Sequence, residues 1–82
     1  MKLYSQDIYK IDDMLFESRE VAVEWLKQGN WKNYGHSWCE LKDVVIDNDL
    51  NIRITWVDEE EGEEDFIVLP VEFENFMVQV NL

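Results

Sequence analysis

The sequence predicts an α+β fold in which one helix, at about residues 19–28, packs on an antiparallel sheet of three to five strands. Three observations predict this class. A capped segment with helical periodicity occurs at residues 18–29, alternating apolar and polar residues occur later in the chain, and 46% of the residues are hydrophobic, as in an ordinary globular domain. We expect a single domain over residues 1–82, because a chain of this length has room for one core.

The helix is predicted from its ends and from one apolar stripe. Ser18 is a favourable N-cap, and Gly29 stands where a left-handed residue commonly ends a helix. Between them, apolar residues recur at the spacing of one helix face and are expected to meet the core: Val21, Ala22, Trp25 and Leu26.

The first strands are predicted from alternation and from the turns between them. Residues 50–56 alternate apolar and polar side chains, the pattern of a half-buried strand. Residues 2–11 fit a first strand or two short extended pieces, and residues 41–46 are a further strand candidate. Asp12-Asp13 favours a turn before the short apolar run 14–16.

The remaining elements follow an acidic run at residues 58–65. Residues 66–69 are expected to pair with the alternating strand as a hairpin whose loop is this acidic run. Pro70 ends that strand, residues 71–76 fit a helical turn that begins at the proline, and alternation in residues 76–82 predicts a closing strand.

Charge is divided unequally between the two halves of the chain. The 82 residues carry 19 Asp and Glu against 7 Lys and Arg, a formal net charge of −12. Residues 1–42 have a net charge of −1, whereas residues 43–82 hold twelve acids and one base and have a net charge of −11. Chains that are acidic only for solubility intersperse both signs, so this segregation indicates a binding surface. Seven of the acids lie together: Asp58, Glu59, Glu60, Glu61, Glu63, Glu64 and Asp65.

Composition disfavours several functions. The longest apolar run, Phe66–Leu69, is too short to cross a membrane. Cys39 is the one cysteine and cannot form an internal disulfide, which fits a reducing, cytoplasmic location. Direct binding of nucleic acid is disfavoured because phosphate neutralisation needs lysines and arginines that are scarce here.

We expect no catalytic or metal site. His36 and Cys39 are the single His and Cys, and the nearby Glu40 and Asp43 would raise the thiol pKa rather than activate the thiol. A calcium loop is disfavoured because Ile52 stands where that loop needs a glycine, within a predicted strand. Four residues otherwise match positions of that loop: Asp47, Asp49, Asn51 and Asp58. The sequence therefore predicts a non-enzymatic protein without cofactor or metal.

The loop expected at residues 29–38 carries the aromatic candidates for partner contacts. It is rich in Gly and Asn, yet it contains Trp31, Tyr34 and Trp38. Trp56 lies on the predicted core face of its strand, whereas Trp31 and Tyr34 are candidate exposed anchors.

The function expected from this charge is the binding of a basic protein. The leading interpretation is an inhibitor of the phage anti-restriction or anti-CRISPR type, which mimics nucleic acid and occupies the basic groove of a DNA- or RNA-binding protein or nuclease. An extended chain rises about 3.3 Å per residue, close to the roughly 3.4 Å between phosphates along one DNA strand. Four further acids would widen the acidic run into a patch if the hairpin ends and the Pro70 turn lie together: Asp47, Asp49, Glu72 and Glu74.

Two other functions remain open. An immunity or antitoxin-type protein would neutralise one cationic partner and would depend on Trp31 and Tyr34 as much as on the acids. An accessory or scaffold domain would carry the acidic run as a solvated loop without a partner.

Overall fold

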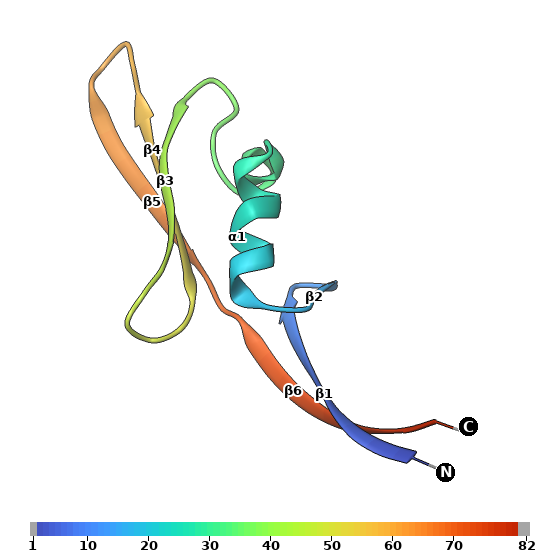
Figure 1. Cartoon of the computed structure of the whole chain (residues 1–82). Helices are drawn as coiled ribbons and strands as arrows, with labels where there is room; N and C mark the ends of the chain where they lie inside the picture. The colour runs from blue at the N-terminus through green and yellow to red at the C-terminus, as the bar shows by residue number, and fades with distance from the viewer. Residues whose placement is uncertain (1, 81–82) are drawn as a thin grey trace.

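Residues 2–80 form six strands, one α-helix and one short 3₁₀ helix, arranged as in Figure 1. The computed structural model describes residues 2–80. The elements are β1 (Lys2–Ile11), β2 (Met14–Phe16), α1 (Arg19–Lys27), η1 (Asn30–Asn33), β3 (Glu40–Ile46), β4 (Ile52–Asp58), β5 (Glu63–Leu69) and β6 (Glu72–Val80).

The strands form two three-stranded antiparallel sheets, in the orders β2-β1-β6 and β3-β4-β5. The α+β class is confirmed, but the prediction of a single sheet is wrong. The second sheet arises because β1 and β6 pair with each other, with Tyr4 opposite Val78 and Tyr9 opposite Phe73. Strand β5 continues into β6 after two residues, so the same stretch of chain passes from one sheet to the other (Figure 1).

The predicted helix is present, and its buried face is turned slightly from the predicted one. The Ser18 side chain accepts a hydrogen bond from the Val21 amide at 3.1 Å, and Gly29 adopts φ 118° after the last turn. Ala22, Val23 and Leu26 are buried, whereas Val21, predicted to face the core, is exposed. Val23 thus takes the place of Val21 in the buried stripe, which packs in one cluster with side chains from both sheets.

The core draws buried side chains from α1 and from β3, β4 and β5. Ile11 and Phe16 bring the other sheet into the same cluster, where the Phe16 ring lies 5.4 Å from the ring of half-buried Trp25. The buried cluster comprises Ile11, Phe16, Ala22, Val23, Leu26, Trp31, Cys39, Val44, Ile52, Ile54, Trp56 and Leu69.

The predicted helical turn at residues 71–76 is wrong, because this segment is the first half of strand β6. Pairing with β1 provides hydrogen-bond partners that a single helical turn would lack. Pro70 lies between the two strands, and the Val71 amide donates to Asn51 Oδ1 at 3.1 Å, which anchors this junction to the β3–β4 turn. The predicted closing strand is confirmed up to Val80, and residues 81–82 lie outside the described part of the chain.

The molecule is long and narrow. Its principal extents are 60 × 23 × 16 Å, and its radius of gyration is 16.2 Å. A compact chain of this length would have a radius of gyration of about 12 Å. The β4–β5 hairpin forms one end, and the free ends of β1 and β6 form the other (Figure 1). Within residues 2–80, no helix has the length and hydropathy needed to span a membrane.

Candidate binding site

The acidic residues 58–65 form the end of the β4–β5 hairpin, which we call the acidic tip. The sequence predicted that all of them lie in the loop, but β4 extends to Asp58 and β5 begins at Glu63. Asp58 faces Glu63, and Trp56 faces Asp65, across the two strands. The turn is therefore only residues 59–62, and the tract folds back on itself instead of forming one extended acidic strip.

Local hydrogen bonds explain why the turn forms here. Gly62 adopts φ 67°, a left-handed conformation that glycine takes without steric cost, and its amide donates to the Asp58 carbonyl. The Asp58 side chain accepts a hydrogen bond from the Glu60 amide at 3.0 Å. Asp58 thus stabilises the turn as well as adding charge to it.

Alternation along the strands divides the tip acids between the two faces of the sheet. Asp58, Glu63 and Asp65 share the face of Trp56, because opposed residues of antiparallel strands project to the same side. Glu64 projects to the other face, where it pairs with Lys42. Lys42 lies at the irregularity in β3 between Leu41 and Asp43.

Most tip carboxylates have no basic neighbour within ion-pair distance. In the part of the chain from residue 2 to residue 80, the salt bridges are Lys42–Glu64 and Lys27–Glu24. The remaining tip acids are therefore concentrated at one end without local neutralisation. A binding function for the tip depends on this concentration of carboxylates that no basic side chain neutralises.

Contact between Glu59 of the tip and Glu40 of β3 changes the protonation of Glu59. Glu59 shares a hydrogen bond with Glu40, at the start of β3, and this contact together with the Glu40 charge raises the pKa of Glu59 above its ordinary value. Glu59 therefore holds its proton to a higher pH than it would without this contact.

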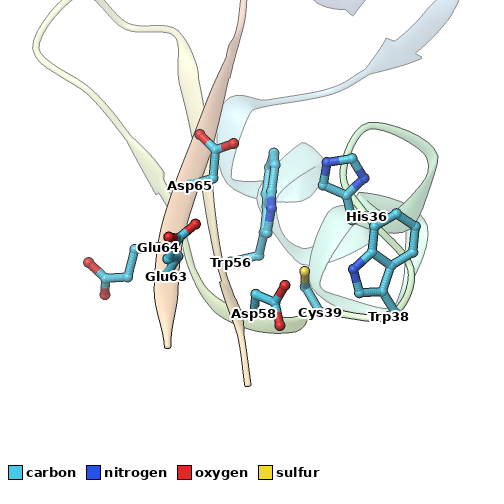
Figure 2. A pocket seen from close by; sticks show the side chains of 8 residues that line it. All are labelled: His36, Trp38, Cys39, Trp56, Asp58, Glu63, Glu64 and Asp65. Carbon is cyan, nitrogen blue, oxygen red and sulfur yellow. The ribbon is translucent and has the colours of Figure 1, made fainter. Parts of the chain in front are cut away.

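A pocket of about 240 Å³ lies beside the tip, between the sheet face and the loop that precedes β3 (Figure 2). Trp56 stands in its centre, and the rings of His36 and Trp38 come from the loop. The His36 ring stacks on Trp38 with centroids 4.5 Å apart and meets the Trp56 ring edge-on at 6.1 Å. Gly35 allows this close approach, since a Cβ there would lie 3.1 Å from the Trp56 ring. The acids that line the pocket are Asp58, Glu63, Glu64 and Asp65.

Trp38 is an aromatic residue at this site that was not predicted from the sequence to be a partner anchor. It is 69% exposed, and a second hollow of about 400 Å³, lined by Asp58, Glu59 and Glu60, lies against the same side chain. An exposed indole ring with carboxylates beside it attracts the cationic side chains of lysine and arginine, through cation–π contact and through charge. Loop residues 34–39 have no periodicity from which its exposure could be predicted.

The two predicted aromatic anchors lie elsewhere. Trp31 is only 4% exposed and belongs to the core, so its prediction as an exposed anchor is wrong. Tyr34 is half-buried against the same core, and burial followed by a hydrogen bond to Asp12 raises the pKa of its hydroxyl. Trp31 lies in η1, and its carbonyl accepts the amides of Tyr34 and Gly35, each at 3.0 Å.

The four acids that were expected to widen the patch do not join the tip. Asp47 and Asp49 lie in the β3–β4 turn, at the opposite end of β4, about 20 Å away for a seven-residue strand. The Asp47 carboxylate accepts the amides of Asp49 and Asn51 at 2.9 and 3.0 Å, a turn-stabilising role. Glu72 and Glu74 lie on β6, opposite Lys10 and Ile8 of β1. The Pro70 junction does meet the β3–β4 turn, but the acidic tip is at the other hairpin end.

The surroundings of Cys39 do not activate its thiol. Burial raises the pKa of the Cys39 thiol, and the charges of Asp58 and Asp65 raise it further, which keeps the thiol protonated. Across residues 2–80, no group of three His, Cys, Asp or Glu side chains is placed to hold a metal ion.

Comparison with protein-family models, with curated proteins and with solved structures gave no match to this chain.

Proposed function

We propose that this chain is a non-enzymatic inhibitor that inserts its acidic tip into the basic, nucleic-acid-binding groove of another protein, such as a nuclease of a restriction or CRISPR system. The observation that carries the proposal is the concentration of carboxylates at one end of a narrow molecule, with Lys42–Glu64 as the one ion pair among them in the described residues. Such a field attracts a basic surface and speeds encounter, by about tenfold or more at low salt.

The shape of the tip supports insertion rather than flat contact. Two strands lie about 4.8 Å apart, so a hairpin end is narrow enough to enter a groove that accepts a nucleic acid strand. Acids on both sheet faces would meet lysines and arginines on both walls of that groove. The turn at residues 59–62 removes the regular eight-residue strip, so the mimicry we propose is one of charge density and not of phosphate spacing.

The test compares two variants of equal net charge. In the tip variant, five acids become glutamine: Glu59, Glu60, Glu61, Glu63 and Glu64. In the control, five acids outside the tip become the matching amides: Asp7, Asp13, Glu17, Glu20 and Glu24. The immobilised proteins are incubated with a bacterial lysate at low salt, and retained nucleic-acid-binding proteins are displaced with duplex DNA.

We expect wild-type and control proteins to retain partners that DNA displaces, and we expect the tip variant to lose them. The proposal would be contradicted if both variants retained the same lysate proteins equally, or if DNA did not displace the retained proteins.

A second candidate function is supported by Trp38. An immunity or antitoxin-type protein binds one partner through a buried aromatic anchor as well as charge, and an exposed tryptophan beside acids suits that role. Trp38→Ala would then weaken binding by about thirtyfold, the effect of losing roughly 2 kcal/mol at a hot spot. Leu15→Ala, a similarly exposed apolar residue away from the tip, is the control. If binding is lost in Trp38→Ala but not in the tip variant, the second function replaces the first. If neither change weakens binding of a partner, the chain acts as an accessory domain.

A further inference from the structure

The paired strands β1 and β6, which we call the arm, project from the rest of the molecule (Figure 1). They pair along nearly their whole length, from Lys2 opposite Val80 to Lys10 opposite Glu72. Strand β2 adds a third strand only beside Tyr9–Ile11. The outer part of the arm is therefore a two-stranded ribbon, an arrangement that is marginally stable in water by itself.

The arm exposes large apolar side chains. Five of them are between 43% and 66% exposed: Leu3, Tyr4, Phe73, Phe76 and Met77. Three of the five lie on β6, next to its open edge: Phe73, Phe76 and Met77. At about 200 Å² for a side chain of aromatic size, half exposure of three such residues offers roughly 300 Å² from one copy, or about 600 Å² from two. That area suits a weak, reversible contact and not a permanent one.

The outer edge of β6 is open and has no protection against pairing. In the described residues β6 pairs with β1 alone, so its other edge presents unpaired amides and carbonyls. Natural sheets usually protect such edges with lysine, proline or a bulge. Residues 72–80 contain no Lys, Arg or Pro, and residues 75–80 contain no charged residue at all.

The charge of the chain directs a second copy to the arm and away from the tip. Residues 2–11 and 72–80 together have a net charge of −1, so almost all of the −12 lies elsewhere. Two acidic tips would repel each other, whereas two arms can approach with little electrostatic penalty.

We propose that a second copy of this chain pairs with the arm, with β6 antiparallel to β6 of the other copy about a two-fold axis at Phe76. This joins the two β2-β1-β6 sheets into one six-stranded sheet and closes the open edge in an isologous contact. The inference does not rest on the proposed function of the tip.

The glutamates of β6 disfavour some registers, and the apolar residues around Phe76 favour this one among the rest. A two-fold axis at residues 72–74 would place a glutamate opposite Glu72 or Glu74 of the other copy, or opposite itself, and like charges directly opposed are destabilising. With the axis at Phe76, Glu74 faces Val78, Met77 faces Asn75, and the two Phe76 rings lie side by side. Apolar pairs then occupy the centre, and the acids lie toward the ends.

The first test measures oligomeric state by sedimentation velocity over a range of protein concentrations. We expect a monomer–dimer equilibrium that Phe76→Lys weakens by at least about tenfold, because a lysine at the edge blocks strand pairing and places two positive charges together. Val45→Lys is the matched control: Val45 is 43% exposed, as Phe76 is, and it lies on the edge strand β3 of the other sheet. Circular dichroism confirms that each variant folds.

The second test fixes the register by cross-linking, in the full chain with Cys39→Ser. Residues directly opposed across antiparallel strands have Cα atoms about 4.5–5.5 Å apart, within disulfide range. Phe76→Cys should therefore oxidise to a covalent dimer, while Val45→Cys should not. A wild-type chain that remains monomeric at all concentrations and both low and high salt, or cysteines that cross-link equally at both positions, would overturn the inference.

Discussion

The acidic tip and the arm are both ends of antiparallel strand pairs, yet they present opposite chemistry to solvent. At the tip, β4 and β5 carry carboxylates on both faces beside the exposed Trp38. In the arm, β1 and β6 carry exposed aromatic and aliphatic side chains and little net charge. The same backbone geometry can therefore support long-range attraction of a basic surface at one end and short-range burial of apolar area at the other.

The two ends also differ in how they join the core. Trp56 links the tip to the buried cluster, whereas residues 3–8 and 73–79 of the arm do not belong to that cluster. At the base of the arm, the Tyr9 and Phe73 rings pair with centroids 5.2 Å apart. Truncation of a side chain at the base of the tip should therefore destabilise the whole fold, whereas a similar truncation in the arm should cost much less stability.

The largest expected effect comes from truncating these two aromatic residues. Trp56→Ala removes a buried indole and should lower the free energy of unfolding by about 3–5 kcal/mol. Phe73→Ala removes a half-exposed ring and one aromatic pair and should lower it by about 1 kcal/mol. Urea denaturation at one low protein concentration measures both, and equal losses would contradict the difference between the two ends.

An intermediate effect is expected from the turn of the tip. Gly62→Ala forces a side chain into φ 67° and should lower the free energy of unfolding by about 1–2 kcal/mol, although a Cβ would contact nothing within 4 Å. Gly62→Asn is the control, since asparagine tolerates this conformation and should lose less. If the two variants melt at the same temperature, backbone strain at this position does not determine the turn.

The smallest expected effect is a pH dependence that arises at the tip. The folded pKa of Glu59 is raised by Glu40, so between its ordinary value near 4.5 and the raised value the folded state binds more protons than the unfolded state. Stability therefore falls as pH rises through that window, and the chain should melt at a higher temperature at pH 5 than at pH 8. Glu40→Gln should reduce this difference, while Glu20→Gln, with the same charge change on α1, should not. A lower melting temperature at pH 5 in the wild type would contradict the carboxyl–carboxyl contact.

Features that depend on neighbouring residues could be predicted from the sequence. Ser18 and Gly29 bracket α1 as expected, because capping is decided within one turn. The alternation that predicted a strand at residues 50–56 is present in β4 from Ile52 onward, with Ile52, Ile54 and Trp56 buried on one face. Leu50 was predicted to belong to this strand but lies in the preceding turn and is exposed. Such signals are local, so they need no knowledge of the rest of the fold.

Features that depend on distant partners could not be predicted. Nothing near β1 indicates that it pairs with β6, some 70 residues later, and this pairing creates the second sheet. Glu63, Glu64 and Asp65 have low strand propensity, yet they form the start of β5 because the hairpin pairs them with β4. Trp31 and Trp38 lie seven residues apart in one irregular segment, and only the packed structure separates the buried ring from the exposed one.

The elongated outline of the molecule has a consequence for how strongly a target is held. With the tip and the arm at opposite ends of a 60 Å body, two copies joined by their arms would point their tips outward in opposite directions. Such an assembly is bivalent. It could bind both copies of the groove at once on a target that is itself two-fold symmetric. The second attachment is then intramolecular, and residence on that target would lengthen by avidity without any new contact.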